Sequence, residues 1–221
     1  MAKHKRNILV IDVGGTNVKV RDQHHAEAVK IPSGEGMSAE EMVEAVEDAA
    51  KDWGYTHISI GYPGPVVDGH PMREPFNLDK GWMQLDFEKA FGRPVRILND
   101  AAMQALGSYH GGRMLFLGLG TGLGSALILA GALAPLELAH LPYRNGKTFE
   151  EYVGARGMER LGKRNWRKHV HRVVELLHNA MVTDYVVLGG GNSAQLKELP
   201  AYAELGNNAN AFTGGLRLWD K

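Results

Sequence analysis

The chain has 221 residues, of which 44% are hydrophobic and 23% are charged, which is enough to bury a core in one large domain or two small lobes. Its formal net charge is zero, which gives no whole-chain argument for a nucleic acid or an anionic membrane as a partner. The absence of cysteine excludes disulfides and thiolate metal sites, and no apolar stretch approaches the roughly 20 residues that span a bilayer. Because its start also lacks an apolar signal region, the sequence predicts a soluble cytoplasmic protein.

The first half of the sequence predicts alternating strands and helices. Residues 7–31 have the pattern of two or three antiparallel strands. Ser38 and Glu41 match a capping box, and apolar residues follow at helical spacing, so we predict a helix that Gly54 ends. The elements expected next are a strand at 57–60, an irregular loop at 61–76, a short helix at 86–91, a strand at 95–98 and a helix from 101 to about 109.

The second half repeats the order strand, glycine turn, strand that opens the chain, which indicates a weak internal duplication. The helix expected at 166–181 carries an apolar stripe that fits either the core or a dimer interface. The other elements expected are strands at 114–117, 125–129 and 184–188, a glycine turn at 118–124, a further turn at 131–135, and helices at 149–161 and 210–218.

The most informative motif runs from Asp12 to Lys19, with the sequence Asp-Val-Gly-Gly-Thr-Asn-Val-Lys. Gly14 and Gly15 carry no side chain, so their backbone N–H groups can approach an anion closely. Thr16 adds a hydroxyl donor, Lys19 adds a charge, and Asp12 can hold a metal directly or through water. No helix follows the glycines, so the motif is neither a Walker loop nor a dinucleotide fingerprint, and it predicts a phosphate-binding hairpin.

Two more glycine segments follow strands, at Gly120-Thr121-Gly122 and at Gly189-Gly190-Gly191-Asn192. Each segment alone is equally typical of a tight turn. Together with the Asp12 motif, they indicate one ligand held between two lobes. We expect the first two turns to face phosphates and the third to lie against a nucleoside.

The order of six motifs resembles that of the ROK sugar kinases, which belong to the actin, sugar kinase and Hsp70 ATPase superfamily. The motifs are Asp12–Thr16, Gly61–Gly64, Leu98–Ala101, Gly120–Gly124, Glu137–His140 and Gly189–Gly191. The resemblance covers nearly the whole chain. Within the family it is most similar to the polyphosphate-type glucokinases, through Asn77–Trp82 and the stretch after His140.

The resemblance implies a two-lobe α/β protein with the actin-like (ribonuclease H-like) ATPase fold, mixed sheets and an active-site cleft between the lobes. We expect residues 1–104 and 205–221 to form the N-terminal lobe, with the phosphate hairpin and the Asn99-Asp100 pair. Residues 105–204 then form the C-terminal lobe, with the second phosphate turn and the glycines on the adenosine side. The family often dimerises, so a homodimer is expected.

A sugar kinase needs a carboxylate that takes the proton from the attacking hydroxyl group. Asp100 is the candidate, because it follows a predicted strand, begins a predicted helix, and matches the catalytic Asp of the family. Asn99 or Asp100 could also simply cap this helix, and capping and catalysis are compatible. Asn99 is expected to hydrogen-bond to neighbouring sugar hydroxyls.

Glu137 and His140 lie three residues apart after the predicted 131–135 turn, a spacing that lets both side chains point into one pocket. The resemblance implies that both contact the sugar ring. It also implies a third contact from a Glu after the next turn, where Glu150 matches best and Glu151 is the rival. Since the chain has no cysteine, we expect no structural zinc and do not predict His140 as a metal ligand.

The phosphoryl donor is predicted to be ATP with Mg²⁺ or polyphosphate, with Asp12 as the protein anchor for the metal. A basic run at helical spacing is typical of a solvated helix face, but it could also guide a polyanion. This run consists of Arg156, Arg160, Lys163, Arg164, Arg167, Lys168 and Arg172.

The sequence therefore predicts a kinase that transfers a phosphoryl group to a hexose, with the 6-hydroxyl of glucose as the acceptor. The alternatives are a kinase for another sugar, such as an amino sugar, and a sugar-sensing ROK protein with weak or no catalysis. A repressor is not expected, because the first strand starts at Asn7 and leaves no room for a DNA-binding helix-turn-helix. The partners predicted are thus a small-molecule sugar and a phosphoryl donor, with no nucleic acid and no membrane.

Overall fold

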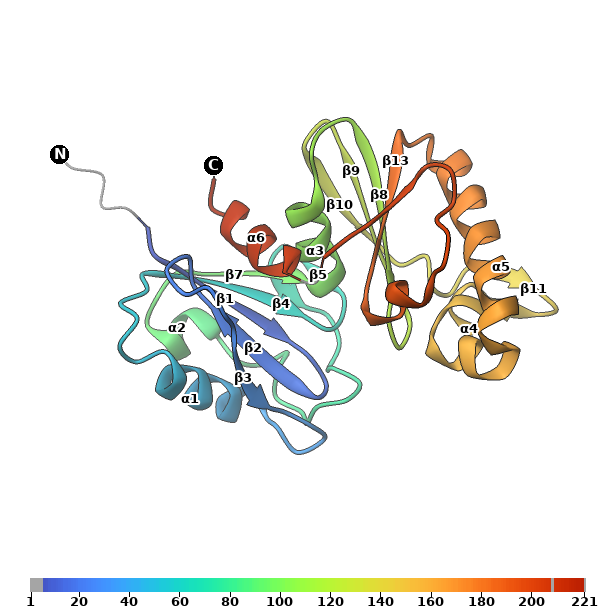
Figure 1. Cartoon of the computed structure of the whole chain (residues 1–221). Helices are drawn as coiled ribbons and strands as arrows, with labels where there is room; N and C mark the ends of the chain where they lie inside the picture. Colours follow the sequence, from blue (N-terminus) through green and yellow to red (C-terminus); the bar gives the residue numbers. More distant parts are fainter. Residues whose placement is uncertain (1–5, 208, 221) are drawn as a thin grey trace. The chain divides into compact units, whose positions relative to one another are not determined.

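The computed structural model of the chain describes residues 6–207 and 209–220. The chain divides into two compact units (Figure 1). Residues up to Met103, together with those from Ala211 onward, form the first unit, and Gln104–Asn210 forms the second. Strands and helices alternate in both units, as the sequence predicts.

The first unit contains a five-stranded mixed sheet of order β3-β2-β1-β4-β7. The strands are β1 (Ile8–Val13), β2 (Asn17–Arg21), β3 (Val29–Pro32), β4 (His57–Tyr62) and β7 (Val95–Asn99). The first three are antiparallel to one another, whereas β4 and β7 run parallel to β1. The helices are α1 (Ala39–Ala49), α2 (Phe87–Phe91), α3 (Asp100–Ser108) and α6 (Asn210–Arg217), with α3 and α6 crossing the unit boundary. The predicted loop at 61–76 contains a small hairpin, β5 (Val66–Val67) and β6 (His70–Pro71).

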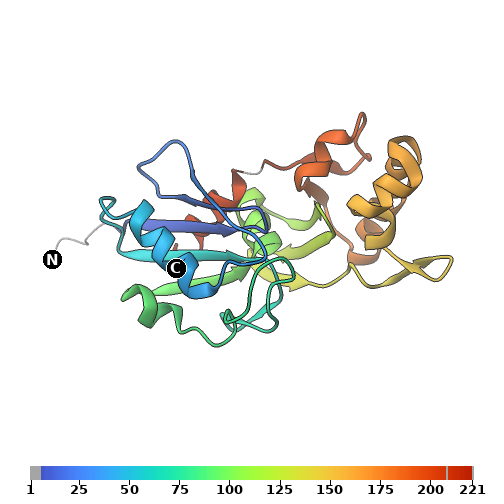
Figure 2. The ribbon, with the colours of Figure 1, turned by 90° about the horizontal axis from the view of Figure 1, so that it is seen from below.

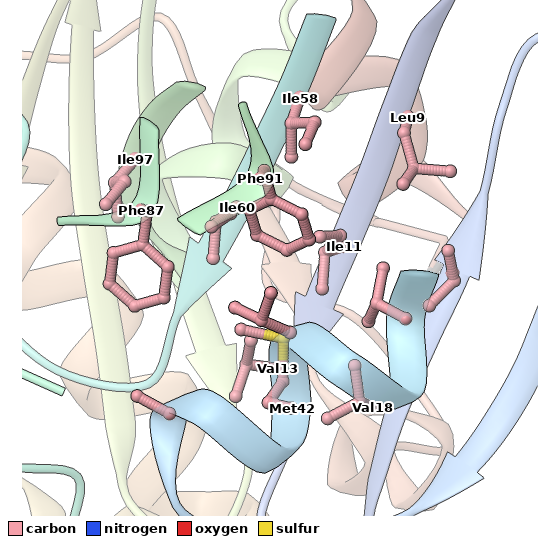
Figure 3. Close-up of a cluster of buried hydrophobic side chains, with 14 of the residues drawn as sticks. Leu9, Ile11, Val13, Val18, Met42, Ile58, Ile60, Phe87, Phe91 and Ile97 are labelled. Carbon is pink, nitrogen blue, oxygen red and sulfur yellow. The ribbon is translucent and has the colours of Figure 1, made fainter. Parts of the chain in front are cut away.

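Both faces of this sheet are buried, which explains the unbroken apolar run at the start of β1. Leu9 and Ile11 pack with Met42 of α1 in one hydrophobic cluster, drawn in Figure 3. Ile8 and Val10 point to the other face and pack with residues of α3 and α6. Figures 1 and 2 show α1 and α6 on opposite faces of the sheet.

The capping box predicted for α1 is present. The Ser38 side chain accepts a hydrogen bond from the Glu41 backbone N–H (3.2 Å), and the Glu41 carboxylate accepts one from the Ser38 N–H (2.8 Å). We expect Ser38→Ala to lower the free energy of unfolding by about 1 kcal/mol, because it leaves a helix donor unpaired. Urea denaturation measures this change. Glu44→Ala, at an exposed position of the same helix, is the control, and an equal loss in both variants would contradict the role of the cap.

Helix α6 is fixed to the sheet by a buried hydrogen-bond chain. The Ser59 hydroxyl of β4 donates to the Gly215 carbonyl (2.7 Å) and accepts from the Trp219 indole N–H (2.9 Å). A Cβ at Gly215 would lie 2.4 Å from a Val10 methyl, so only glycine permits this close approach. The C-terminal residues therefore complete the core of the first unit.

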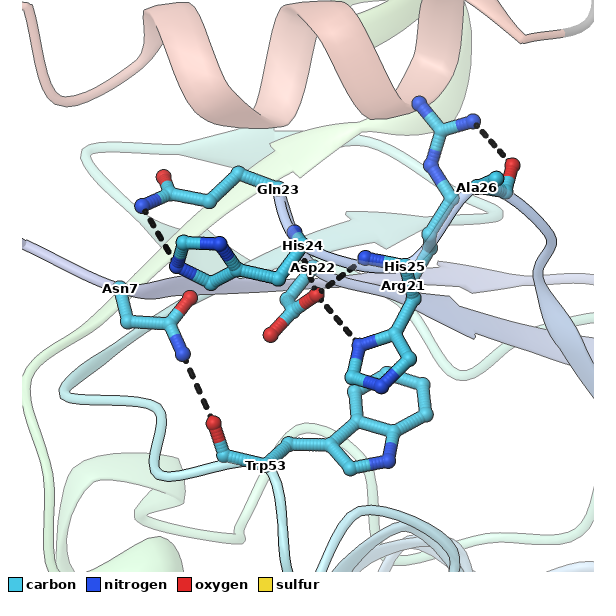
Figure 4. A network of polar contacts seen from close by, with 8 residues as sticks. All are labelled: Asn7, Arg21, Asp22, Gln23, His24, His25, Ala26 and Trp53. Atoms are coloured by element: carbon cyan, nitrogen blue, oxygen red, sulfur yellow. Dashed lines mark hydrogen bonds and ion pairs between the residues drawn. The ribbon is translucent and has the colours of Figure 1, made fainter.

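The connection between β2 and β3 is organised by the buried carboxylate of Asp22 (Figure 4). Its Oδ1 accepts hydrogen bonds from the His24 and His25 backbone N–H groups and contacts His25 Nδ1 at 2.7 Å. Burial raises the pKa of Asp22, but these hydrogen bonds outweigh it and hold the pKa below its usual range. The His25 ring stacks on Trp53 with centroids 4.0 Å apart, which ties this connection to the end of the α1 region.

The second unit contains a sheet of order β10-β9-β8-β13-β14, which is the topology of the first sheet. Its strands are β8 (Arg113–Leu119), β9 (Leu123–Leu129), β10 (Ala132–Leu136), β13 (Tyr185–Gly189) and β14 (Ala203–Leu205). The remaining elements are the hairpin β11 (Pro142–Arg144) and β12 (Lys147–Thr148), the helices α4 (Glu150–Val153) and α5 (Ala155–Met181), and the 3₁₀ helix η1 (Gly191–Gln195). The shared topology confirms the predicted internal repeat.

Two predicted turns of this unit differ from the structure. The turn predicted at 131–135 was wrong, because these residues belong mostly to β10, which pairs with β9, and the chain turns at Ala130 and Gly131. The turn predicted at 118–124 is shorter, because Gly118 pairs with Gly124 and the strands continue to Leu119 and Leu123. The ladder hydrogen bonds need only backbone groups, so glycine takes part in them.

Helix α5 is interrupted at Gly162, which has φ +71° and ψ +152°. This break separates the two predicted helices, although the second begins at Lys163 rather than at Trp166. The apolar stripe, including Trp166 and Val170, is buried in the core of its own unit, and the predicted homodimer stays a prediction. In the described part of the chain, no helix combines the length and apolar character that a membrane crossing requires.

Candidate functional site

Asp12 and Lys19 stand opposite each other at the mouth of the first glycine turn. They are register partners in β1 and β2, and Lys19 Nζ lies 3.2 Å from Asp12 Oδ2. The Asp12 side chain is 15% exposed and that of Lys19 is 39% exposed, so solutes can reach both. Gly14 and Thr16 lie within the turn itself, which the Gly14 N–H closes onto the Asn17 carbonyl (3.2 Å).

Two residues outside the motif support this turn. Ser33 donates its hydroxyl to the Gly14 carbonyl (2.6 Å) and its N–H to the Thr16 carbonyl (3.0 Å). A Cβ at Gly15 would lie 2.9 Å from Asn77 Cβ, so Asn77 packs directly on the turn. Neither was predicted as a site residue. For Asn77 the only sequence signal was its place in the Asn77–Trp82 motif.

The turn suits a cation that arrives with its phosphate ligands. Residues 6–207 and 209–220 contain no group of three or more His, Asp or Glu side chains that could together bind a metal ion. Asp12 therefore offers a single carboxylate. Mg²⁺ keeps several waters and is commonly bound by one or two carboxylates plus substrate phosphates, so this donor set fits Mg²⁺ on a phosphorylated ligand.

Asn99 and Asp100 lie where β7 ends and α3 begins. Asn99 Oδ1 accepts from the Ala102 N–H (3.2 Å), and its Nδ2 donates to the Gly64 carbonyl (3.0 Å), so Asn99 caps the helix and holds the 61–76 segment. Asp100 Oδ1 accepts from the N–H of the next residue (2.7 Å). Both residues are partly exposed, and the helix N-terminus favours a negative charge at Asp100.

Strand register brings the Asp12 turn and the Asn99-Asp100 pair to one edge of the first sheet. Asp12 pairs with Gly61 of β4, and Gly61 pairs with Leu98 of β7. A Cβ at Gly61 would lie 2.3 Å from Met103 Cε, so the start of α3 packs closely on β4. Ligands of α/β sheets collect at the carboxyl ends of such parallel strands.

In the second unit, the second and third glycine segments lie together. Asn192 donates its side-chain N–H to the Gly120 carbonyl (2.8 Å), and the Ala155 N–H lies 3.1 Å from the Gly120 and Thr121 carbonyls. Gly190 has φ +79°, and a Cβ there would lie 2.5 Å from the Leu119 carbonyl oxygen. A larger residue at Gly190 would therefore separate the two segments.

An open hollow of ≈ 450 Å³ lies beside the third segment. It is lined by Gly190, Gly191, Ser193, Ala194, Leu205, Gly206 and Asn207. Pockets for small ligands typically measure about 300–1,000 Å³. No motif in the sequence indicates residues 205–207 as part of a site. Gly189 lies inside β13 instead, where a Cβ would meet the Phe116 ring at 2.5 Å.

Glu150 lies beside both the second glycine turn and the segment that carries Glu137 and His140. Its N–H donates to the Ala139 carbonyl (3.0 Å), and its carboxylate accepts from the Leu123 N–H (3.3 Å). A Cβ at Gly122 would lie 2.2 Å from Glu150 Oε2. Glu137 and His140 are exposed, and neither side chain hydrogen-bonds within the described part of the chain.

Glu151 is engaged elsewhere. Its carboxylate accepts from Lys147 Nζ (2.9 Å) and from the Thr148 backbone N–H (2.8 Å). These two hydrogen bonds lower the pKa of Glu151. Of the two neighbouring carboxylates, Glu150 is thus the one that lies against the glycine turn.

The family model of the ROK family matches residues 6–135. A curated relative, the polyphosphate glucokinase of Mycobacterium tuberculosis, is 29% identical over 214 residues, which are 87% of this chain and 80% of that protein. The polyphosphate glucokinase of Mycobacterium leprae is 29% identical over 205 residues, 83% of this chain. The match spans 63% of the length of the M. leprae protein.

Solved structures share the fold. An inorganic polyphosphate/ATP-glucomannokinase from Arthrobacter sp. strain KM has a TM-score of 0.76 and 24% identity, with 97% of this chain and 98% of that chain covered. A ROK family glucokinase from Streptomyces griseus, in complex with glucose and AMPPNP, has a TM-score of 0.72 and 18% identity, with 96% and 98% covered. These similarities confirm the predicted fold class, the actin-like α/β ATPase fold with mixed sheets.

Proposed function

Because the chain belongs to the ROK family, we propose that it is a sugar kinase that transfers the terminal phosphoryl group of ATP or polyphosphate to a hexose. The acceptor that we infer is O6 of glucose. The names of the mycobacterial relatives support both the sugar and polyphosphate as a donor. The presence of Asp12, Lys19 and Asp100 together supports an active enzyme over a sensor.

The observation that carries this proposal is the shared edge of the first sheet. The phosphate-type turn follows β1, the Asn99-Asp100 pair follows β7, and only β4 separates these two strands. Neighbouring strands are about 4.8 Å apart, which places the two groups roughly 10 Å apart across the sheet. This spacing suits a donor phosphate chain at the turn and an acceptor hydroxyl beside Asp100.

In the proposed reaction, the O6 oxygen of glucose bonds to the terminal phosphorus as the bond from that phosphorus to its bridging oxygen breaks. The electron pair of the broken bond stays on the bridging oxygen. The products are glucose 6-phosphate and either ADP or a polyphosphate one unit shorter. Asp100 takes the O6 proton as general base, and Asn99 holds the neighbouring hydroxyls.

Mg²⁺ is the metal that we propose for the donor, with Asp12 as its anchor, directly or through water. A bound Mg²⁺ would neutralise negative charge on the phosphate oxygens. Lys19 adds a positive charge at the same mouth, and its ion pair with Asp12 orients both side chains.

The remaining roles follow the positions of the glycine segments and the carboxylates. We assign further sugar contacts to Glu137, His140 and Glu150. Donor contacts are assigned to Gly14, Gly15, Thr16, Gly120, Thr121, Gly122, Gly190, Gly191 and Asn192. Gly189 supports this set through its packing inside β13. The hollow beside Gly191 is the proposed place of the nucleoside when ATP is the donor.

A coupled assay with a panel of sugars tests the function. We expect phosphorylation of glucose with Mg²⁺ and ATP or long-chain polyphosphate, and weaker turnover of mannose and an amino sugar. Omitting Mg²⁺ is expected to abolish turnover, because the donor charge is then not neutralised. A lack of product with every sugar and both donors would leave the sensor interpretation instead.

A further inference from the structure

We propose that the exposed basic side of α5 binds the remote units of a polyphosphate chain whose terminal phosphoryl group is being transferred. This basic side is defined by Lys163, Arg164, Arg167, Lys168 and Arg172. The inference rests on the proposed function, and it adds the residues that would distinguish a long polyanionic donor from ATP.

Charge is concentrated in this part of a chain whose formal net charge is zero. Residues 160–172 contain no Asp or Glu. At 100° per residue the five cations fall within one half of the helix circumference, opposite the half that carries buried Trp166 and Val170. From Lys163 to Arg172 the helix rises about 14 Å, which allows contact with several consecutive phosphate units.

The basic side begins beside the glycine-lined hollow. Lys163 Nζ donates to Gln195 Oε1 (2.7 Å), and Arg167 Nε donates to the Gln195 carbonyl (2.6 Å). Gln195 follows Ala194, which lines the hollow. A chain that leaves the hollow at Ala194 therefore meets these two cations first.

Most of this charge is not neutralised locally. The Gln195 partners of Lys163 and Arg167 are uncharged, so the positive charge of both side chains remains. Arg164 and Lys168 are exposed, and neither forms an ion pair or hydrogen bond with its side chain among the residues that the structure describes. Within the described residues, Arg172 alone of the five has an acidic partner, Glu175, at 2.8 Å.

The surface fits inorganic polyphosphate better than a nucleic acid. Single-stranded nucleic acids bind through aromatic platforms on which bases stack, as well as through positive charge. The only Trp, Tyr or Phe within α5 is Trp166, which is buried with 0% exposure. ATP ends with its nucleoside, so it does not extend onto α5, whereas polyphosphate continues as a row of negative charges.

The double variant Arg164→Gln, Lys168→Gln tests the inference, because both side chains are exposed and form no ion pair with any residue of 6–207 or 209–220. We measure KM for long-chain polyphosphate, tripolyphosphate and ATP with glucose as the acceptor. The KM for long-chain polyphosphate is expected to rise about 25-fold, since each of the two cations near an anionic surface contributes about a factor of five. The KM for ATP and tripolyphosphate should change less than about twofold. The salt dependence of the long-chain KM should become shallower by about 1.5 units of log–log slope, because two cationic contacts are lost.

Lys30→Gln, Lys89→Gln is the matched control, with the same charge change at exposed positions of the first unit. Equal KM values for long-chain polyphosphate in the wild type and the α5 variant would overturn the inference. An equal rise of this KM in the α5 variant and in the control variant would also overturn it. Loss of single-stranded RNA binding in the α5 variant with unchanged polyphosphate kinetics would overturn it too. If the wild type phosphorylates no sugar with either ATP or polyphosphate, the proposed function itself has failed, which is a separate result.

Discussion

Replacement of Asp100 with Asn is expected to lower kcat by about 10²–10⁴-fold, which is the usual contribution of a positioned general base. The Asn side chain has nearly the same shape and can still accept the hydrogen bond from the Ala101 N–H. It cannot take the proton from O6, because a neutral amide is too weak a base. Glucose binding should therefore remain close to that of the wild type.

Steady-state kinetics give kcat, and isothermal titration with glucose gives the dissociation constant. Asp52→Asn is the control for the loss of one carboxylate, because this exposed side chain forms no hydrogen bond or ion pair among the described residues. Unchanged turnover in the Asp100 variant would remove this residue from the mechanism. Loss of glucose binding together with turnover would make Asp100 a binding group instead of the base.

Trp166→Ala is expected to lower the free energy of unfolding by about 3–5 kcal/mol. The Trp166 side chain is 0% exposed in the core of the second unit, so its removal leaves a large cavity. It also removes the hydrogen bond from the indole Nε1 to the Val153 carbonyl (2.8 Å), which joins α5 to α4. Denaturation in urea, followed by circular dichroism, measures the loss.

Two further variants separate the causes. Trp166→Phe retains much of the ring and loses the hydrogen bond, so we expect a smaller destabilisation of about 1–3 kcal/mol. Phe76→Ala removes a ring that is 91% exposed, and it should change the stability by less than about 0.5 kcal/mol. If Trp166→Ala were as stable as Phe76→Ala, the apolar stripe of α5 would not be part of the core.

The elements that were predicted best from the sequence depend on contacts between residues that are close together along the chain. The Ser38 capping box needs only a residue three positions away, and the hairpin at Asp12–Lys19 pairs strands that are adjacent in the sequence. The break in α5 was also expected, since the sequence predicted two helices on either side of Gly162. Such features form from local hydrogen bonds and backbone preferences, which a single sequence contains.

The elements that were missed depend on pairing with a neighbouring strand. Residues 131–135 include glycine and proline and lack β-branched side chains, so they were interpreted as a turn. They form most of an edge strand because β9 supplies a partner, and an edge strand tolerates Pro135. Strand β14 likewise exists only through its pairing with β13.

The same limit applies to the candidate site. The sequence alone did not distinguish Glu150 from Glu151 as the third sugar contact, because the two residues are adjacent and chemically identical. The contacts of Glu150 with Leu123 and of Glu151 with Lys147 distinguish them, and only the fold reveals the first contact. The packing of Asn77 on Gly15 also joins residues far apart in sequence.

The hydrogen bonds that fix α6 through Ser59 and Trp219 have a consequence for biosynthesis. The second unit is one contiguous segment, whereas the first unit is made of segments that lie before and after it in the chain. The first unit cannot finish its core until residues 211–220 have been translated and have left the exit tunnel. Strands β1, β4 and β7 must therefore wait, with one apolar face uncovered, for α6, which is translated only after the whole second unit.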